Sequence, residues 1–314
     1  MPRFTVIIPT YNWSSVLPFS IGSVLRQTLA DFELLVIGDG CTDDSAAVVA
    51  GINDPRLRWI NLPANSGHQS GPNNEGLRQA RGQFIAYLGH DDLWFPHHLA
   101  RMAEGFETGA HVCYGVTELV PPGGGPPRPA PFALAEYVPG NWMPPSGVAH
   151  RLEAVQRVGG WPDLRGLPDD PESILWRRMH GAGCRFHFVR SLTAVKFPAA
   201  WRRDVYKLRP THEQSAWSQR MQSESDMEVT ELLKMLSAAV QVPAEQKSLR
   251  QLIREFRREL IDRARGRWSG KSRTKKAITR EQFQDDRREF KGLDRRFATG
   301  AASPSPIATP APRN

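Results

Sequence analysis

The chain has 314 residues, which suits one large α/β domain with an appendage or two modest domains and excludes a small peptide-like fold. Apolar residues make up 40% and charged residues 24%, so a globular protein with a sizeable core is expected. The net charge is +8, and much of the basic excess lies between Arg250 and Lys276. That excess favours an anionic surface as partner, although a solvated helix face followed by a disordered tail explains it equally well.

No apolar run is as long as a membrane-spanning helix requires, and the N-terminus enters a strand pattern too early for a signal peptide. We therefore expect a cytoplasmic protein. Cys41, Cys113 and Cys184 stand far apart, so the sequence predicts neither a disulfide framework nor a zinc cluster. Each cysteine is expected to be a buried or half-buried small side chain.

Four short apolar runs predict buried strands early in the chain, and each run ends at a polar loop. The runs are 4–8, 32–37, 57–60 and 84–88. Apolar residues at helical spacing over 16–25, and a short helical pattern near 44–51, place helices between these strands. Strands that alternate with helices predict a largely parallel sheet whose ligand sites lie at the carboxyl ends of the strands.

The next part of the chain gives fewer signals. Residues 111–116 predict another strand, and the Pro/Gly stretch 121–131 predicts a surface loop or flap without regular structure. The acidic stretch 169–172 precedes a helix that we expect to end near Gly181 or Gly183.

Helical periodicity returns over 213–240 and 244–265, and the sequence then becomes basic and finally rich in Ala, Ser, Pro and Thr. We therefore expect three parts: an α/β domain over 1–205, a helical extension over 206–265 and a basic, largely disordered tail over 266–314.

Asp91 and Asp92 follow the predicted strand 84–88 directly. Two adjacent carboxylates are costly to hold together without a cation, because like charges raise each other's pKa. Mg²⁺ or Mn²⁺, bound through one or two carboxylates and the oxygens of a diphosphate, would relieve that conflict. The alternative is that one aspartate caps a helix near Pro96 while the other faces water.

Asp39 stands between Gly38 and Gly40 at the end of the second predicted strand. Glycines let the backbone approach a ligand closely, and a carboxylate there can accept from a ribose hydroxyl or a base N–H. The alternative is a common Asp-Gly turn in which residues 42–44 cap the next helix.

Six segments read together resemble the family 2 glycosyltransferases, inverting enzymes with the GT-A fold. The segments are VIIPTYN (6–12), LLVIGDGCTDDS (34–45), NSGHQSGPNNEG (65–76), ARGQFIAYLGHDDLWFP (80–96), GGW (159–161) and LWRRMHGAGCRF (175–186). The resemblance ends near residue 205. It implies a Rossmann-like, mostly parallel sheet flanked by helices, with a C-terminal helical appendage.

The resemblance also implies which residues bind a nucleotide sugar. The loop after the first strand would hold the nucleotide through Pro9, Thr10, Tyr11 and Asn12. Asp39 matches the carboxylate that accepts from the base, and Asn74 lies in the donor-binding segment.

Asp91 matches the aspartate of the family's D-x-D motif that touches the metal, so the resemblance implies Mn²⁺ or Mg²⁺ as cofactor. His90 fills the middle position of that motif and is assigned to the donor site with it. The motif's first aspartate is absent, because Gly89 stands in its place.

The general base of the family is the second member of a Glu-Asp pair ahead of a hydrophobic helix. Here the segment PDDPES offers Asp169, Asp170 and Glu172. A gapless match places Glu172 at the base position, whereas matching the acidic pair selects Asp170, and we favour Glu172 slightly. The alternative is that Pro171 opens a helix, with Asp170 as its cap and Glu172 favourable to its dipole.

Three further residues are candidates for contact with the sugar, the acceptor or the diphosphate. Trp94 and Trp161 could border the sugar or acceptor, because aromatic faces pack on sugar C–H surfaces, although we expect Trp94 to be buried. His212 could close over the diphosphate as a late histidine does in some GT-A enzymes, but a helix start at Thr211 explains this segment as well.

The resemblance therefore implies an inverting transferase that moves a sugar from a nucleotide diphosphate donor to a hydroxyl of a glycan or lipid-linked acceptor, in cell-surface polysaccharide synthesis. The alternative is a catalytically degenerate domain that binds the donor or a glycan without turnover. We expect no nucleic acid partner, because the basic tail lacks interleaved aromatic residues, and we expect peripheral contact with an anionic membrane at its inner face.

Overall fold

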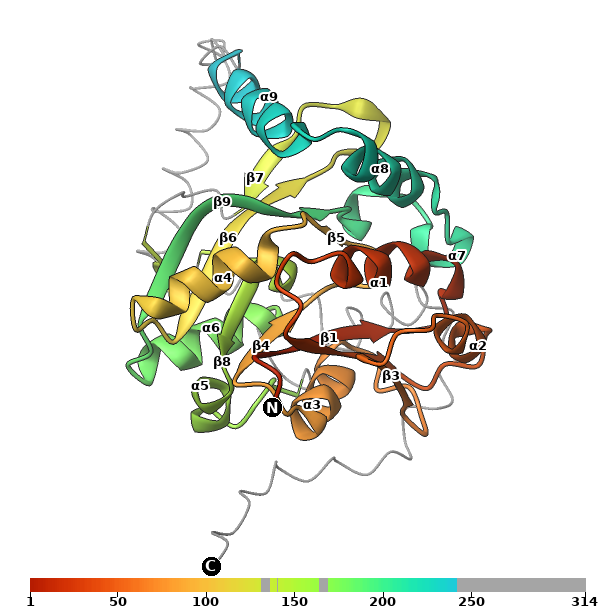
Figure 1. Ribbon diagram of the computed structural model, residues 1–314, viewed down its shortest axis with the longest axis vertical. Coiled ribbons are helices and arrows are strands. Elements are labelled where there is room, and N and C mark those ends of the chain that lie inside the picture. The colour runs from red at the N-terminus through yellow and green to blue at the C-terminus, as the bar shows by residue number, and fades with distance from the viewer. Residues whose placement is uncertain (131–135, 140, 164–168, 242–314) are drawn as a thin grey trace, which may run out of the picture.

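The computed structural model describes residues 1–130, 136–139, 141–163 and 169–241, through which one nine-stranded sheet runs (Figure 1). The strands are β1 (Phe4–Thr10), β2 (Phe32–Gly38), β3 (Leu57–Asn61), β4 (Phe84–Tyr87), β5 (Leu93–Trp94), β6 (Val112–Leu119), β7 (Arg128–Ala130), β8 (Val148–Arg151) and β9 (Phe186–Lys196). Their spatial order is β3-β2-β1-β4-β8-β6-β9-β5, and β7 pairs with β6.

The first half of the sheet is parallel, as predicted. β1 pairs with β2 and β4, and β2 pairs with β3, all in parallel register. The four predicted strands are confirmed, and the first extends to Thr10, which lies opposite Gly38. The polar residues that follow β1, β2 and β4 therefore meet at one edge of the sheet.

The second half of the sheet is mixed. β8 is antiparallel to both β4 and β6, whereas β6 is parallel to β9, and β9 is antiparallel to β5. The predicted strand over 111–116 is confirmed and runs on to Leu119, while β8 and β9 were not anticipated. The sheet is thus wholly parallel only in the part formed by β1 to β4, which sequence periodicity identified.

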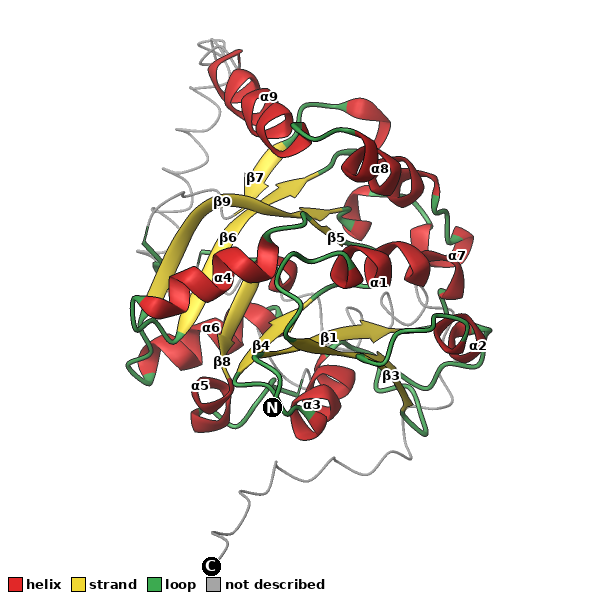
Figure 2. Cartoon of the chain, in the orientation of Figure 1, coloured by secondary structure: helices red, strands yellow, loops and turns green. Residues whose placement is uncertain are grey.

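Helices cover both faces of the sheet, which gives three layers (Figure 2). The longer helices of this part are α1 (Leu17–Leu25), α2 (Ser45–Ala50), α3 (Ser70–Gln79), α4 (His98–Glu107), α5 (Leu152–Arg157) and α6 (Pro171–Gly181), with 3₁₀ turns at Ser14–Val16, Pro122–Gly124, Pro145–Gly147 and Ala199–Trp201. Val6 and Ile8 pack with α1 and α4, whereas Ile7 between them packs with α3 and α6. This alternation follows from the period of two in a strand, which sends successive side chains to opposite faces.

The last described residues form α7 (Val205–Leu208), α8 (His212–Ser223) and α9 (Met227–Gln241). The helix predicted over 213–240 is therefore two helices with a break between them. Met227 and Met235 of α9 are buried in one cluster with Phe197, so this helix packs against the end of the sheet. The helix predicted over 244–265 and the tail lie outside the described residues, and the three-part division stays a prediction.

The prediction that 121–131 lacks regular structure is wrong over its last described residues. Arg128–Ala130 form β7, and the residue pairs Thr117↔Ala130 and Leu119↔Arg128 join it to β6 in antiparallel register. Pro129 is tolerated because β7 is an edge strand, where a missing backbone N–H leaves no ladder bond unmade.

The cysteines and the lack of long apolar helices agree with the sequence within the described residues. Cys113 and Cys184 are buried, Cys41 is half-buried, and all three are free thiols, as expected. Across the described ranges, no helix combines the length and apolar character needed to cross a bilayer.

Candidate functional site

A cleft of about 150 Å³ lies where β1, β2 and β4 end. Of the residues predicted to bind a nucleotide sugar, those that line it are Pro9, Thr10, Tyr11, Asp39, His90 and Asp91. Parallel strands bring these side chains together although the residues are far apart in sequence. Six of the eight residues predicted to bind a nucleotide sugar therefore line one cleft.

Asn12 is not among the cleft residues, because the neighbouring loop engages its side chain. Its backbone is left-handed with φ of 46°, a conformation that asparagine tolerates better than most residues. Its Oδ1 accepts from the backbone N–H groups of Thr42 at 2.7 Å and Asp43 at 3.3 Å. Asn12 therefore ties together the loops after β1 and β2.

Asp39 is buried at the cleft wall, with 2% of its surface exposed. Its Oδ1 accepts from the backbone N–H of Ser66 at 2.9 Å, and its own N–H donates to the Thr10 carbonyl at 2.8 Å. Burial, and then the charge of Asp39, raises the pKa of Tyr11. These contacts fix a carboxylate beside an aromatic ring, which suits a group with N–H donors and a flat face.

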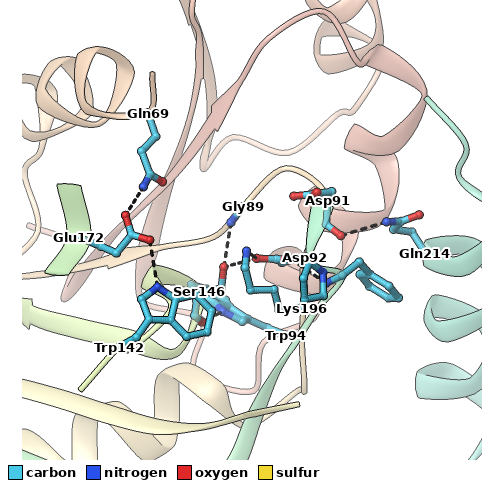
Figure 3. A network of polar contacts seen from close by, with 12 residues as sticks. Gln69, Gly89, Asp91, Asp92, Trp94, Trp142, Ser146, Glu172, Lys196 and Gln214 are labelled. Carbon is cyan, nitrogen blue, oxygen red and sulfur yellow. Dashed lines mark hydrogen bonds and ion pairs between the residues drawn. The ribbon is translucent and has the colours of Figure 1, made fainter. Parts of the chain in front are cut away.

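Asp92 has 0% exposure, and protein donors engage both of its oxygens (Figure 3). Its Oδ2 accepts from Ser146 Oγ at 2.5 Å and Lys196 Nζ at 3.0 Å, and its Oδ1 from the Phe197 N–H at 3.2 Å. The alternative, in which one aspartate of the pair caps a helix near Pro96 while the other faces water, is therefore wrong for Asp92. Lys196 supplies the cation that the adjacent carboxylates require.

Asp91 lines the cleft beside this buried pair. Burial, and next the charge of Asp92, raises the pKa of Asp91, while Lys196 acts in the opposite direction. The Asp91 carbonyl accepts from Gln214 Nε2 at 3.2 Å, so α8 holds this loop from outside. A glycine is required at position 89 for a steric reason. A Cβ there would lie 2.7 Å from Asp92 Oδ2, an atom that Ser146 and Lys196 hold in place.

The oxygen ligands that the cleft offers suit a metal ion that is held mainly by the phosphate oxygens of a bound substrate. Within the described residues, no three His, Cys, Asp or Glu side chains lie close enough to form a metal site. Asp91 lines the cleft, whereas the oxygens of Asp92 are engaged by the protein. Mg²⁺ is often bound through one or two carboxylates together with phosphate oxygens, so Asp91 can serve as its protein ligand.

Glu172 lies one side chain behind the cleft wall (Figure 3). Its Oε2 accepts from Nε2 of Gln69, which lines the cleft, at 2.7 Å, and its Oε1 accepts from Trp142 Nε1 at 3.2 Å. Burial, and then the charge of Asp170, raises the pKa of Glu172. The structure therefore brings Glu172 to the site as a buried carboxylate that binds a proton more readily than usual.

The other acidic candidates lie at the surface. Pro171 begins α6, and Asp170 occupies the N-cap position with its side chain exposed. Asp169 pairs with Arg177 at 2.5 Å, and both side chains are more than a third exposed. Glu172, in contrast, is buried and accepts a hydrogen bond from the cleft residue Gln69.

Asn74 and Trp161 form a structural link instead of lining the cleft. Asn74 Nδ2 donates to the Trp161 carbonyl at 2.9 Å, and Asn74 Oδ1 accepts from the Trp161 N–H at 2.8 Å. Trp161 is 2% exposed and meets Tyr87 edge to face at 5.0 Å. Trp94 is also buried, as expected, and donates from Nε1 to the Ser146 carbonyl at 2.6 Å.

Sequence reasoning missed part of the cleft lining, namely Trp13, His68, Gln69, Pro72, Lys196, Tyr206 and Arg209. His212 is exposed at the start of α8 and does not line the cleft, whereas Arg209 does. Trp13 Nε1 donates to the Arg209 carbonyl at 3.1 Å, which fixes this segment against β1. Gln69 lies inside a donor-segment motif and could have been found there, whereas Lys196 and Arg209 stand in no motif.

Parts of this chain resemble known proteins. Residues 5–153 match the family model described as Glycosyl transferase family 2. An uncharacterized glycosyltransferase of Nostoc sp. is 31% identical over 209 residues, which cover 62% of this chain and 61% of the relative. The UDP-Glc:alpha-D-GlcNAc-diphosphoundecaprenol beta-1,3-glucosyltransferase WfgD of Escherichia coli is 37% identical over 95 residues, 30% of this chain and 37% of that enzyme. The chain thus spans less than two thirds of either relative.

Solved structures share the fold at low identity. Staphylococcus aureus TarS 1–349 in complex with UDP has a TM-score of 0.54 and 22% identity, covering 62% of this chain and 60% of that chain. The mannosyltransferase PcManGT from Pyrobaculum calidifontis in complex with GDP-Man and Mn²⁺ has a TM-score of 0.53 and 16% identity, covering 92% and 85%. The fold is therefore of the GT-A type, and residues 5–153, just under half of the chain, match glycosyl transferase family 2.

Proposed function

We propose that the protein is an inverting glycosyltransferase that moves a sugar from a nucleotide diphosphate donor to a hydroxyl of a glycan or lipid-linked acceptor. The observation that carries this proposal is the cleft at the ends of β1, β2 and β4, with Asp91 in its wall and the buried Glu172 behind Gln69. Asp91 can lie at the donor's diphosphate, while Glu172 can act on the acceptor.

The donor would occupy the cleft with its base toward Asp39 and Tyr11. Asp39 is held by backbone contacts, so its carboxylate is already oriented to accept from a base N–H. His90 lies 2.9 Å from Thr10 Oγ1 through its Nδ1, which joins the loops that follow β1 and β4. Support comes from the two solved structures, whose ligands are UDP and GDP-Man.

Asp91 would hold a Mn²⁺ or Mg²⁺ ion bound to the diphosphate. When bound, such an ion neutralises charge that develops on a leaving phosphate. Asp91 itself contributes one carboxylate at a fixed place, since Gln214 holds its backbone carbonyl. The PcManGT structure contains Mn²⁺, which supports a metal at this kind of site.

Glu172 would act as the general base that takes the proton from the acceptor hydroxyl. A base with a raised pKa shares a proton more evenly with its partner near neutral pH, which favours proton transfer. Gln69 and Trp142 donate to its two oxygens and keep the carboxylate in one orientation. Asp170 stays the alternative base, from the same end of α6.

The acceptor would be a glycan or a lipid-linked precursor of a cell-surface polysaccharide, reached from the cytoplasmic side of a membrane. WfgD, by its name, acts on a diphosphoundecaprenol-linked sugar. The basic residues between Arg250 and Lys276 would bring the protein to an anionic lipid surface where such acceptors lie.

Incubating the full chain with a panel of nucleotide sugars and Mn²⁺ tests this function. Release of nucleoside diphosphate by slow donor hydrolysis is expected, and Asp91→Asn should lower it by about a hundredfold or more. Asp31→Asn, an exposed aspartate outside the cleft, is the matched control and should keep full activity. Undiminished release by Asp91→Asn in the presence of a chelator would reject the mechanism.

The same assay separates turnover from binding alone. Gly89, which stands in place of the motif's first aspartate, is the observation that favours a degenerate domain. Such a domain would bind a nucleotide sugar with no release of diphosphate from any donor in the panel.

A further inference from the structure

Lys196 ends β9 and reaches the cleft from the mixed half of the sheet, beyond the segment that matches the family model. Its side chain is 23% exposed and lines the cleft together with Asp91. Its Nζ lies 3.0 Å from Asp92 Oδ2, an atom buried in the protein (Figure 3). The ammonium group is therefore fixed at the boundary between the interior and the cleft.

The contacts of Asp92 leave Lys196 able to bind a ligand. An ammonium group has three N–H donors, and the bond to Asp92 uses one of them. Ser146 and the Phe197 N–H supply the other bonds to Asp92, so the carboxylate does not depend on Lys196 alone for hydrogen bonds. Lys196 can then donate toward the cleft without leaving its partner.

The charge of Lys196 is stable in this position. Burial acts to lower the pKa of Lys196, but the charges of Asp92 and Asp91 outweigh it and raise that pKa. A lysine in this state stays protonated across the physiological range, because its ordinary value already lies above 10.

A cationic side chain in the wall favours the binding of a diphosphate in this cleft. Without Lys196, its wall would present the charge of Asp91 with that of Asp92 directly behind it, and both repel an anion. Arg209, from the segment between α7 and α8, lines the same cleft and adds a second cation. The two cationic residues come from parts of the chain that no motif covers, and they converge on one site.

We propose that Lys196 is a donor-binding residue, which donates a hydrogen bond to the diphosphate of the nucleotide sugar while it remains paired with Asp92. This inference rests on the proposed function and adds a residue to it. As the acceptor oxygen bonds to the sugar carbon, the bond between that carbon and the diphosphate oxygen breaks and its electron pair goes to the diphosphate oxygen. Lys196 neutralises part of the resulting charge without transferring its proton.

Calorimetric titration of the full chain with UDP and GDP tests the proposal. Lys196→Met should weaken binding of the nucleoside diphosphate between about tenfold and a hundredfold, as expected for a lost hydrogen bond between charged groups. Binding of uridine or guanosine, which carry no phosphate, should not change. Lys196→Arg should recover part of the lost affinity, because it keeps the charge.

Two further variants control for folding. Lys196→Met leaves Asp92 buried without its cation, whereas Lys196→Met combined with Asp92→Asn removes both charges and should show the same loss of diphosphate affinity. Arg81→Met is the matched control, since Arg81 pairs with the buried Glu33 at 2.7 Å and is not a cleft residue. It should bind both nucleotides as the wild type does.

The outcomes separate this inference from the function on which it rests. Wild-type affinity for UDP and GDP in the folded double variant would overturn the role of Lys196 and leave the transferase intact. Equal losses for nucleosides and nucleoside diphosphates would also overturn it, because they indicate a general collapse of the cleft. Diphosphate binding that depends on Lys196 without any turnover would support the inference while rejecting the transferase.

Discussion

Each acidic residue of the cleft region has its own set of partners, and those partners decide what it can do. Asp92 is engaged by Ser146 and Lys196, and Asp39 by the backbone of Ser66, so both act through a fixed position. Glu172 is held by two neutral donors, which orient a carboxylate without cancelling its charge. Buried polar groups require such partners, and the kind of partner distinguishes a structural acid from a reactive one.

Glu172→Gln should lower kcat by about a hundredfold to ten-thousandfold and leave the affinity for UDP or GDP unchanged, because a general base acts on the acceptor. In the wild type, kcat should fall as the pH drops through the raised pKa of Glu172, at a higher pH than for an ordinary carboxylate. Steady-state kinetics between pH 5 and 9 measure both effects. Asp169→Asn is the surface control, and a larger loss in Asp170→Asn than in Glu172→Gln would assign the base to Asp170.

At the scale of elements, α9 is joined to β6 through a buried pair of acids. Glu118 of β6 and Glu231 of α9 are 1% and 3% exposed. Glu231 accepts from Arg220 at 2.6 Å and from Lys234 at 2.8 Å, so it has cationic partners. Burial, and then the charge of Glu231, raises the pKa of Glu118 to about 8. A proton on Glu118 therefore relieves the repulsion between the two buried carboxylates at the contact of β6 with α9.

This contact should make the fold less stable as the pH rises. The native state keeps a proton on Glu118 that the unfolded state loses near its ordinary value of 4.5, so the contribution is full below that pH and declines up to about 8. One such group changes the free energy of unfolding by at most about 1.4 kcal/mol per pH unit. Urea unfolding at pH 5, 7 and 9 should show a shallower decline in Glu118→Gln than in the wild type. Identical slopes, with exposed Glu104→Gln as control, would contradict this.

For the whole molecule, exposed apolar side chains and an excess of basic residues both occur toward the C-terminal end of the chain. Val229, Leu233 and Leu236 of α9 are 58%, 59% and 51% exposed, and their spacing puts them on one side of the helix. The chain beyond Gln241 has roughly twice as many Lys and Arg as Asp and Glu. An apolar helix side next to basic sequence suits the proposed contact with anionic lipid.

The full chain should float with vesicles that contain phosphatidylserine, and a chain ending at Gln241 should float much less. Both should stay unbound with neutral phosphatidylcholine vesicles, and added salt should release the full chain, because charge attraction is screened. Vesicle flotation with both chains measures this. Equal flotation of the two chains on anionic vesicles would show that the segment after Gln241 does not bind the membrane.

The sequence by itself determined the four parallel strands, their polar ends and the family motifs, including Asp39 and Asp91 at one edge of a sheet. It could do so because strand periodicity is local and because parallel strands place their carboxyl ends together. Only the tertiary structure decided that Asp92 pairs with Lys196, that Glu172 lies behind Gln69 and that β9 joins the sheet. These contacts join residues 74 to 104 positions apart, and no local pattern encodes which side chains meet after such a separation.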